Sequence, residues 1–459
     1  MAKDIRIEED TLGKVEIPAT ALWGPQTERS RNNFPTGSYI PLEIIKALLQ
    51  IKKAAAQSNE KEDQLPAERT QPIIKAIDQL LALSDEDLRA DFPLKVYQTG
   101  SGTQTNMNVN EVVAHLATKL ADGVEILPND DVNRGQSSND IFPTAMNMTA
   151  SVAVKELEEA VSHLIAELKV KQDKYWKVVK VGRTHLQDAT PLTFGQEVSG
   201  WVSMLEHDLS YLQTLAPTLL EFPMGGTAVG TGLNADPHFA ADIAEKVSAI
   251  YGMEFNAETN KFYGLEAHSG LNVVHGAMKT LAADCMKIAN DVRFLASGPR
   301  AAYGELNIPA NEPGSSIMPG KVNPTQAEAI TMAAVRVMGN DVVVDMASSQ
   351  GNFQLNVYKP VLIQAFLESA DLLRGTITGF ADKMIHGLTV NEERMTELVQ
   401  NSLMTVTALS PHIGYHDSAK IAQEADKNGT TLKVAALASG KVTEEQFDEW
   451  VDPLKMTNI

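Results

Sequence analysis

The sequence contains one cysteine, few aromatic residues and fewer basic than acidic side chains. Cys285 has no second cysteine for an internal disulfide, and one thiol cannot supply the ligands of an iron–sulfur cluster. The chain has 39 Lys and Arg residues and 59 Asp and Glu residues. The resulting net charge of -20 repels nucleic acids and anionic membrane surfaces. No apolar run approaches the roughly 20 residues of a membrane span. We therefore expect no nucleic-acid or membrane partner and, because a lone thiol suits a reducing compartment, a cytoplasmic location.

The usual motifs of metal and nucleotide sites are also missing. The ten histidines are scattered, and none forms a His-Glu-x-x-His pair or joins a Cys/His cluster. Five residues separate Gly314 from Gly320, where a phosphate-binding loop needs four, and Val322 stands where that loop needs Ser or Thr. The Gly100-Ser101-Gly102 and Gly225-Gly226 segments follow no strand pattern, which argues against a dinucleotide site. We expect no metal ion and no organic cofactor.

Long apolar stripes at helical spacing are the strongest positive signal. The chain has 459 residues, more than the roughly 250 to 300 that one hydrophobic core supports. The clearest stripe steps by four and three residues from Val274 to Leu295, and similar stripes cover residues 157–168, 198–212 and 362–377. A further helix is expected after Pro324 and past Val337. The pattern predicts a mainly α fold with a central bundle of five helices of about 20 or more residues. We place the domains at residues 1–136, 137–388 and 389–459.

Short polar segments separate these helices and are the candidate sites of chemistry. They cover residues 99–110, 136–143, 182–195, 225–234 and 311–324, and are rich in Gly, Ser, Thr, Asn and Pro. Together they offer Ser, Thr and Asn side chains with one lysine and one histidine, a set that suits carboxylate binding and proton transfer without a cofactor. Each residue alone is more often structural. Their combination points to a binding site for small carboxylates.

Five of these motifs resemble the fumarase/aspartase superfamily, in order and over nearly the whole chain from about Leu12. They are Ser101-Gly102-Thr103-Gln104, Gln136-Ser137-Ser138-Asn139-Asp140, Gly182 to Asp188, Gly226 to Gly232, and Gly314 to Pro324. The Gly314 to Pro324 loop indicates only the superfamily. The Thr184-His185 pair and the Ser101-Gly102-Thr103-Gln104 segment resemble the class II fumarase branch, because aspartases typically carry Gln at the histidine position and a different loop near Ser101. The segment from Pro411 to Tyr415 is also similar to the fumarase C-terminal domain.

This resemblance implies a reaction and a set of catalytic residues. The expected activity is the reversible hydration of fumarate to L-malate in the citric acid cycle, through an aci-carboxylate intermediate. Ser315 is expected to be the base, and His185 to handle the water or the leaving hydroxyl, oriented by Glu328. Lys321 and Asn323 are expected to stabilise the developing negative charge.

The resemblance also implies a set of substrate contacts and an assembly. The expected binding residues are Ser101, Gly102, Thr103, Ser137, Ser138, Asn139, Thr184, Ser316, Lys321, Val322 and Asn323. Family members form homotetramers whose sites combine residues of three chains. The alternatives are an aspartase-like ammonia-lyase and a catalytically silent scaffold of the same superfamily, although the complete catalytic set argues against silence.

One position departs from the family pattern. Fumarases typically carry a histidine two positions before an Asn-Asp pair in a second, accessory dicarboxylate site, but this chain has Leu127 before Asn129 and Asp130. A leucine cannot donate a hydrogen bond to a carboxylate, and Asp130 would repel an anion. We therefore expect this accessory site to be weak or absent.

Overall fold

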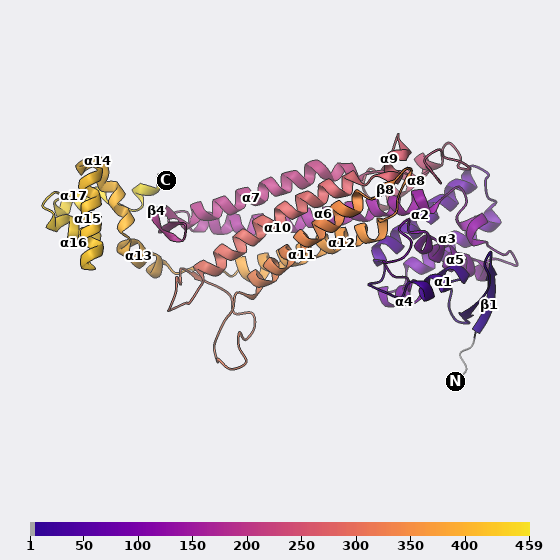
Figure 1. Cartoon of the computed structure of the whole chain (residues 1–459), viewed down its shortest axis with the longest axis horizontal. Coiled ribbons are helices and arrows are strands. Elements are labelled where there is room, and N and C mark those ends of the chain that lie inside the picture. Colours follow the sequence, from indigo (N-terminus) through magenta and orange to yellow (C-terminus); the bar gives the residue numbers. More distant parts are fainter. Residues whose placement is uncertain (1–4) are drawn as a thin grey trace. The chain divides into compact units, whose positions relative to one another are not determined.

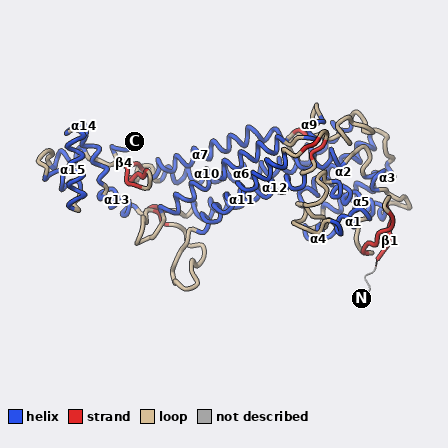
Figure 2. Tube along the Cα trace, viewed as in Figure 1, coloured by secondary structure: helices blue, strands red, loops and turns tan. Residues whose placement is uncertain are grey.

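Helices dominate the structure, a computed structural model that describes residues 5–459 (Figures 1 and 2). The chain forms two compact units. Unit 1 contains residues 5–158, 211–279 and 336–372, and unit 2 contains residues 159–210, 280–335 and 373–459. In the described residues, no helix is long and apolar enough to span a membrane. The predicted mainly α fold is confirmed, whereas the three domain boundaries stay a prediction.

Five long helices run through the central part of the sequence, as predicted. They are α6 (Ser138–Lys174), α7 (Phe194–Leu215), α10 (Ser269–Leu295), α11 (Thr325–Ser348) and α12 (Lys359–Phe380). The predicted stripe of α10 is buried, with Met278 and Leu281 fully covered. Within unit 1, His275 joins three helices, because its ring bonds to Asp341 of α11 and Ser369 of α12 at 2.9 Å each.

The rest of unit 1 consists of shorter helices and paired short strands. The helices are α1 (Pro25–Asn33), α2 (Leu42–Lys61), α3 (Ala67–Leu81), α4 (Asp85–Asp91), α5 (Thr103–Leu120), α8 (Phe239–Tyr251) and α9 (Lys261–Glu266), with single turns η1 (Pro128–Val132) and η2 (Ala216–Leu219). The strands β1 (Ile5–Asp10) and β2 (Gly13–Pro18), and β8 (Gly351–Asn352) and β9 (Leu355–Asn356), pair antiparallel, while β5 (Glu221–Phe222) and β6 (Asn256–Ala257) pair parallel. Helix α2 packs against α3 and α8.

Unit 2 contains one longer hairpin and the C-terminal helices. Strands β3 (Val179–Thr184) and β4 (Gln187–Thr193) pair antiparallel, as do β7 (Leu306–Asn307) and β10 (Thr389–Val390). The remaining elements are η3 (Ala381–Ile385), α13 (Glu392–Asn401), η4 (Leu403–Leu409), α14 (Ser410–Ile413), α15 (Tyr415–Asn428), α16 (Leu432–Ala438), α17 (Glu444–Trp450) and η5 (Lys455–Thr457). The C-terminal helices share an apolar core around Leu409, Ile421 and Phe447.

The structure corrects the sequence-based assignment at three places. Most of segment 99–110 belongs to α5, because its polar side chains Asn106 and Asn110 are buried in tertiary hydrogen bonds. Segment 136–143 is helical from Ser138, and Pro143 lies inside α6, where it cannot donate a backbone hydrogen bond. Segment 182–195 forms most of the β3–β4 hairpin.

Candidate active site

The predicted site residues fall into two groups, one in each unit. Unit 1 holds Ser101, Gly102, Thr103, Asn129, Asp130, Ser137, Ser138 and Asn139, and unit 2 holds Thr184, His185, Ser315, Ser316, Lys321, Val322, Asn323 and Glu328.

The first loop of unit 1 presents two hydroxyls at the start of α5. Gly102 precedes the helix with φ 80°, and a Cβ there would lie 2.4 Å from the Phe142 ring, so both backbone and space favour glycine. The hydroxyls of Ser101 and Thr103 are 2.8 Å apart. Because helix N-termini favour negative groups, this arrangement suits a carboxylate.

The second loop of unit 1 is fixed by a buried carboxylate. Asp140 accepts hydrogen bonds from the backbone N–H groups of Ser137, Gly225 and Thr227 at 2.9, 3.1 and 2.9 Å. Burial raises the pKa of the Asp140 carboxyl, while these donors and Lys52 oppose that shift. The carboxylate therefore ties the Ser137 loop at the start of α6 to the loop after β5.

A side chain of α5 and a backbone carbonyl of the loop after β5 hold the next two predicted residues. The Asn106 amide donates to the Ser138 hydroxyl at 3.0 Å. The Asn139 amide donates to the Ala228 carbonyl at 2.7 Å, so one of its donors is already engaged. Ser137 to Asn139 thus form a rigid segment at the helix N-terminus.

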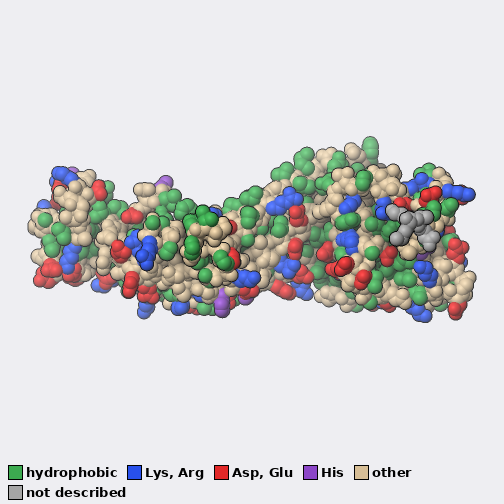
Figure 3. All heavy atoms as spheres, turned by 90° about the horizontal axis from the view of Figure 1, so that it is seen from below, with side chains coloured by type: hydrophobic (Ala, Val, Ile, Leu, Met, Phe, Trp, Pro, Cys, Tyr) green, Lys and Arg blue, Asp and Glu red, His purple; other side chains and the backbone are tan. Residues whose placement is uncertain are grey.

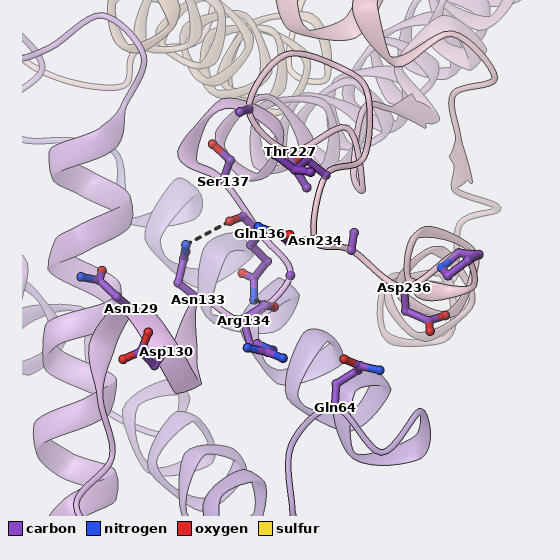
Figure 4. Close-up of a pocket in the computed structure, with 15 residues that line it drawn as sticks. Gln64, Asn129, Asp130, Asn133, Arg134, Gln136, Ser137, Thr227, Asn234 and Asp236 are labelled. Carbon is purple, nitrogen blue, oxygen red and sulfur yellow. Dashed lines mark hydrogen bonds between the residues drawn. The ribbon is translucent and has the colours of Figure 1, made fainter.

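A pocket of about 850 Å³ opens beside this segment (Figure 4). Its lining includes Ser137 of the main candidate site, Asn129 and Asp130 of the accessory site, and the side chain of Arg134. Arg134 was not among the residues predicted from the sequence. Its guanidinium can donate strong hydrogen bonds to an anion, which the Leu127 side chain cannot do. Ser101 and Thr103 are not part of the pocket lining. The weakness of the accessory site stays a prediction.

Sequence reasoning also missed a buried lysine beneath this pocket. The fully buried Lys52 of α2 donates from Nζ to Asn133 Oδ1 and Gln136 Oε1, both at 2.8 Å. Asn106, which holds Ser138, donates to the same Asn133 oxygen at 3.1 Å. The available signal was the position of Lys52 in an apolar helical stripe of α2, where a solvated lysine is not expected.

In unit 2, the β3–β4 hairpin carries His185 at its tip. Thr184 pairs with Gln187, which leaves His185 and Leu186 as the two turn residues, with φ 57° and 61°. Two positive φ values match a tight hairpin turn, a conformation that usually requires Asn or Gly. Backbone strain of this kind is often found at functional sites, where it fixes a side chain in place. Thr184 and His185 are both exposed.

A buried ion pair holds the base of this hairpin. Arg183 donates from two nitrogens to the fully buried Glu305 at 3.0 and 2.9 Å, a bidentate arrangement. Its guanidinium also lies over the Tyr303 ring, 4.4 Å from the centroid. The sequence analysis did not predict these contacts, which fix the residue two positions before His185.

The loop from Gly314 to Pro324 closes on itself at its two ends. The Gly314 N–H donates to the Lys321 carbonyl at 2.9 Å, and the Asn323 amide donates to the Gly314 carbonyl at 2.7 Å. A Cβ on Gly314 would lie 2.5 Å from the Lys321 carbonyl oxygen, so this close approach requires glycine. Ser316, Lys321 and Val322 are exposed on the closed loop.

Ser315 accepts two backbone hydrogen bonds inside this loop. The N–H groups of Ile317 and Met318 donate to its Oγ at 3.2 and 3.0 Å. Glu328 lies in the first turn of α11, which begins directly after Pro324 as predicted. Within residues 5–459, no hydrogen bond joins the Glu328 carboxylate to the His185 ring. Their pairing stays a prediction.

Comparisons with known proteins agree with this fold and these loops. A family model described as Lyase matches residues 13–339, and a second, described as Fumarase C C-terminus, matches residues 406–458. The class II fumarate hydratase of Listeria monocytogenes is 54% identical and covers 99% of this chain and 100% of its own length. That of Bacillus subtilis is 51% identical, with 99% of both chains covered.

A solved structure gives the same result. The crystal structure of class II fumarase from Schistosoma mansoni superposes with a TM-score of 0.94 and 40% identity, covering 99% of each chain. The broad class is therefore a lyase of the fumarase/aspartase type. The chain belongs to the class II fumarate hydratase family, as its motifs predicted.

Proposed function

We propose that this chain catalyses the reversible hydration of fumarate to L-malate in the citric acid cycle, using acid–base chemistry of its own side chains. In the dehydration direction, Ser315 Oγ takes a proton from the carbon next to one carboxylate of malate. The electron pair moves into that carboxylate as an aci-carboxylate. It then returns to form the C=C bond as the hydroxyl leaves with a proton delivered through His185, which yields fumarate and water.

The two backbone donors on Ser315 Oγ are the observation that carries this proposal. A serine hydroxyl is a weak acid, so a serine base needs donors that stabilise its alkoxide. The N–H groups of Ile317 and Met318 already point at this oxygen in the closed loop. Preorganised donors of this kind act most strongly where negative charge develops.

Substrate binding is assigned mainly to neutral donors, with Lys321 supplying a positive charge. The hydroxyls of Ser101 and Thr103 and the segment from Ser137 to Asn139 lie at the N-termini of α5 and α6. These groups suit the two carboxylates of fumarate or L-malate, since helix N-termini favour anions.

We further propose a homotetramer in which several chains complete each site. Helix α11 exposes large apolar side chains at helical spacing, among them Met332, Val335, Val342 and Met346, with exposed fractions of 68, 62, 63 and 59%. An apolar stripe of this length is typical of a helix covered by another subunit. On the face shown in Figure 3, charged side chains of both signs are interspersed. We place the assembly in the cytoplasm, where Cys285 stays a free thiol.

The direct test is to follow fumarate absorbance after adding purified, chelator-treated protein to L-malate. We expect fumarate to accumulate, and the reverse reaction to consume it. An aspartase-like activity would instead release fumarate and ammonia from L-aspartate and leave L-malate unchanged. No turnover of either substrate would indicate a silent scaffold and refute the proposal.

A further inference from the structure

Lys359, the first residue of α12, has a buried amino group without a hydrogen-bond partner in the described part of the protein. Its side chain is 0% exposed, and in residues 5–459 no protein group accepts a hydrogen bond from its Nζ. Lys52, in contrast, is equally buried but donates to two amide oxygens. Burying a charge without a partner costs free energy. A lysine at such a position is therefore rarely retained for the stability of the fold alone.

The backbone of Lys359 supports the first substrate loop. Its N–H donates to the Gly100 carbonyl at 3.0 Å, directly before Ser101. The fit is close, because a Cβ on Gly100 would lie 1.3 Å from the Val357 carbonyl oxygen. The start of α12 is therefore hydrogen-bonded to the residue that precedes Ser101.

The side chain of Lys359 acts on the second substrate loop. Asp140, whose carboxylate fixes Ser137, is the acid that favours the charged form of both Lys359 and Lys52. Burial lowers the pKa of Lys52 well below its usual value, and Asp140 opposes this shift. Burial lowers the pKa of Lys359 to about 7, and Asp140 opposes this shift.

The surrounding titratable groups do not supply a further counter-charge to Lys359. Burial lowers the pKa of the adjacent His268 to about 3, so this imidazole stays neutral. Lys261, whose pKa burial also lowers, interacts with Asp140 and with Glu258. Burial raises the pKa of Glu258 to about 7.

We propose that Lys359 is a positioning residue for the substrate, whose buried amino group, together with that of Lys52, supplies positive charge behind the Ser101–Thr103 and Ser137–Asn139 loops when a dianion is bound. The neutral donors of these loops would contact the carboxylates, and the two buried amino groups, once protonated, would attract the dianion through the protein. This inference rests on the proposed function, because it assumes a dicarboxylate in that site. It explains why Lys359 is buried without a hydrogen-bond partner.

The test compares Lys359→Met and Lys359→Arg with Lys53→Met, a matched control on α2 whose ammonium pairs with Asp78 at the surface. The measurements are kcat and KM for L-malate, the inhibition constant of succinate as an unreactive dicarboxylate, and the urea midpoint of unfolding. For Lys359→Met we expect KM and the succinate constant to rise about tenfold, the scale of one Coulomb interaction in a protein, with a smaller change in kcat. Lys359→Arg should retain most of the affinity.

The urea midpoint of unfolding distinguishes a substrate-positioning role of Lys359 from a purely structural role. Because the Lys359 ammonium has no protein partner, Lys359→Met should unfold at the same or higher urea concentration than the wild type. A wild-type succinate constant in Lys359→Met, or a loss of kcat in proportion to a lower urea midpoint, would refute the proposal. If the wild type and Lys53→Met do not convert L-malate, the proposed function fails instead.

Calorimetry tests the same inference on the unmodified protein. Succinate binding at pH 7 should draw a fraction of a proton onto Lys359, because a nearby dianion favours the charged form. Titrations in two buffers of different ionisation enthalpy measure this uptake. The uptake should be smaller in Lys359→Met, and succinate binding without proton uptake in the wild type would contradict the role of Lys359 even if the variants do not fold.

Discussion

Replacing Asp208 by asparagine should stabilise the protein at alkaline pH and much less at acid pH. Asp208 lies on α7 and is 1% exposed. Burial, together with the negative charge of Asp284 on α10, raises its pKa from 3.8 to about 7. The unfolded chain, in contrast, loses this proton near the ordinary pKa of an aspartate.

The sign follows from proton binding in the two states. Between about pH 4 and pH 7 the folded protein keeps a proton that the unfolded chain has lost, so stability falls as pH rises through this window. A shift of about three units corresponds to about 4 kcal/mol above pH 7, at 1.36 kcal/mol per unit. Relaxation and water entry reduce this upper bound to about 2 kcal/mol. An asparagine side chain at this position carries no charge and avoids the cost.

Urea unfolding at pH 5 and pH 8, at one protein concentration, measures this effect. The advantage of Asp208→Asn over the wild type should grow by about 1 to 3 kcal/mol between the two pH values. Asp426→Asn, an exposed change on α15, serves as the control and should show no such growth. An equal change at both pH values, or a loss of stability at pH 8, would refute the reasoning.

Four further predictions concern the site. Ser315→Ala and His185→Asn should fold normally and lose at least about a hundredfold in kcat, so near-wild-type turnover in either would remove that residue from its role. Refolding the two variants together should restore some activity, because shared sites can combine one intact residue from each chain, and a mixture no better than its parents would contradict sharing. Arg183→Met should lower stability by about 3 kcal/mol in urea unfolding, because Glu305 stays buried beside Lys180 alone, and an unchanged midpoint would show that the pair is not structural. Leu127→His should increase the number of dicarboxylates bound per chain in equilibrium dialysis, whereas two per chain in the wild type would show that the leucine does not weaken the accessory site.

The long helices could be predicted because their burial follows directly from residue spacing. Apolar residues every three or four positions from Val274 to Leu295 define one helix face, and that face is buried. The start of α5 could not be predicted in this way. Its buried asparagines, such as Asn106, favour turns on their own, and only hydrogen bonds to residues 27 and 32 positions away make them suitable for a helix interior.

The β3–β4 hairpin was missed because its turn lacks the usual signal. A two-residue turn with both φ values positive is normally marked by Asn-Gly or Asp-Gly, yet here His185 and Leu186 occupy it. The motif still identified His185 as a candidate for catalysis. The sequence rule for two-residue hairpin turns therefore failed at His185, a candidate catalytic residue. Strained backbone is often found at such functional positions.

The supporting residues of the site could not be inferred from motifs at all. From sequence, a lysine is assigned to the surface, since only the fold shows that Lys52 and Lys359 are buried around Asp140. The same limit applies to Arg134, because only the fold shows that its side chain lines the same pocket as Asn129. Short motifs thus identify residues expected to contact the substrate. The buried charges near those residues depend on contacts between residues far apart in the sequence and are not visible in a motif. Variants of such residues should change substrate affinity while every motif residue remains in place.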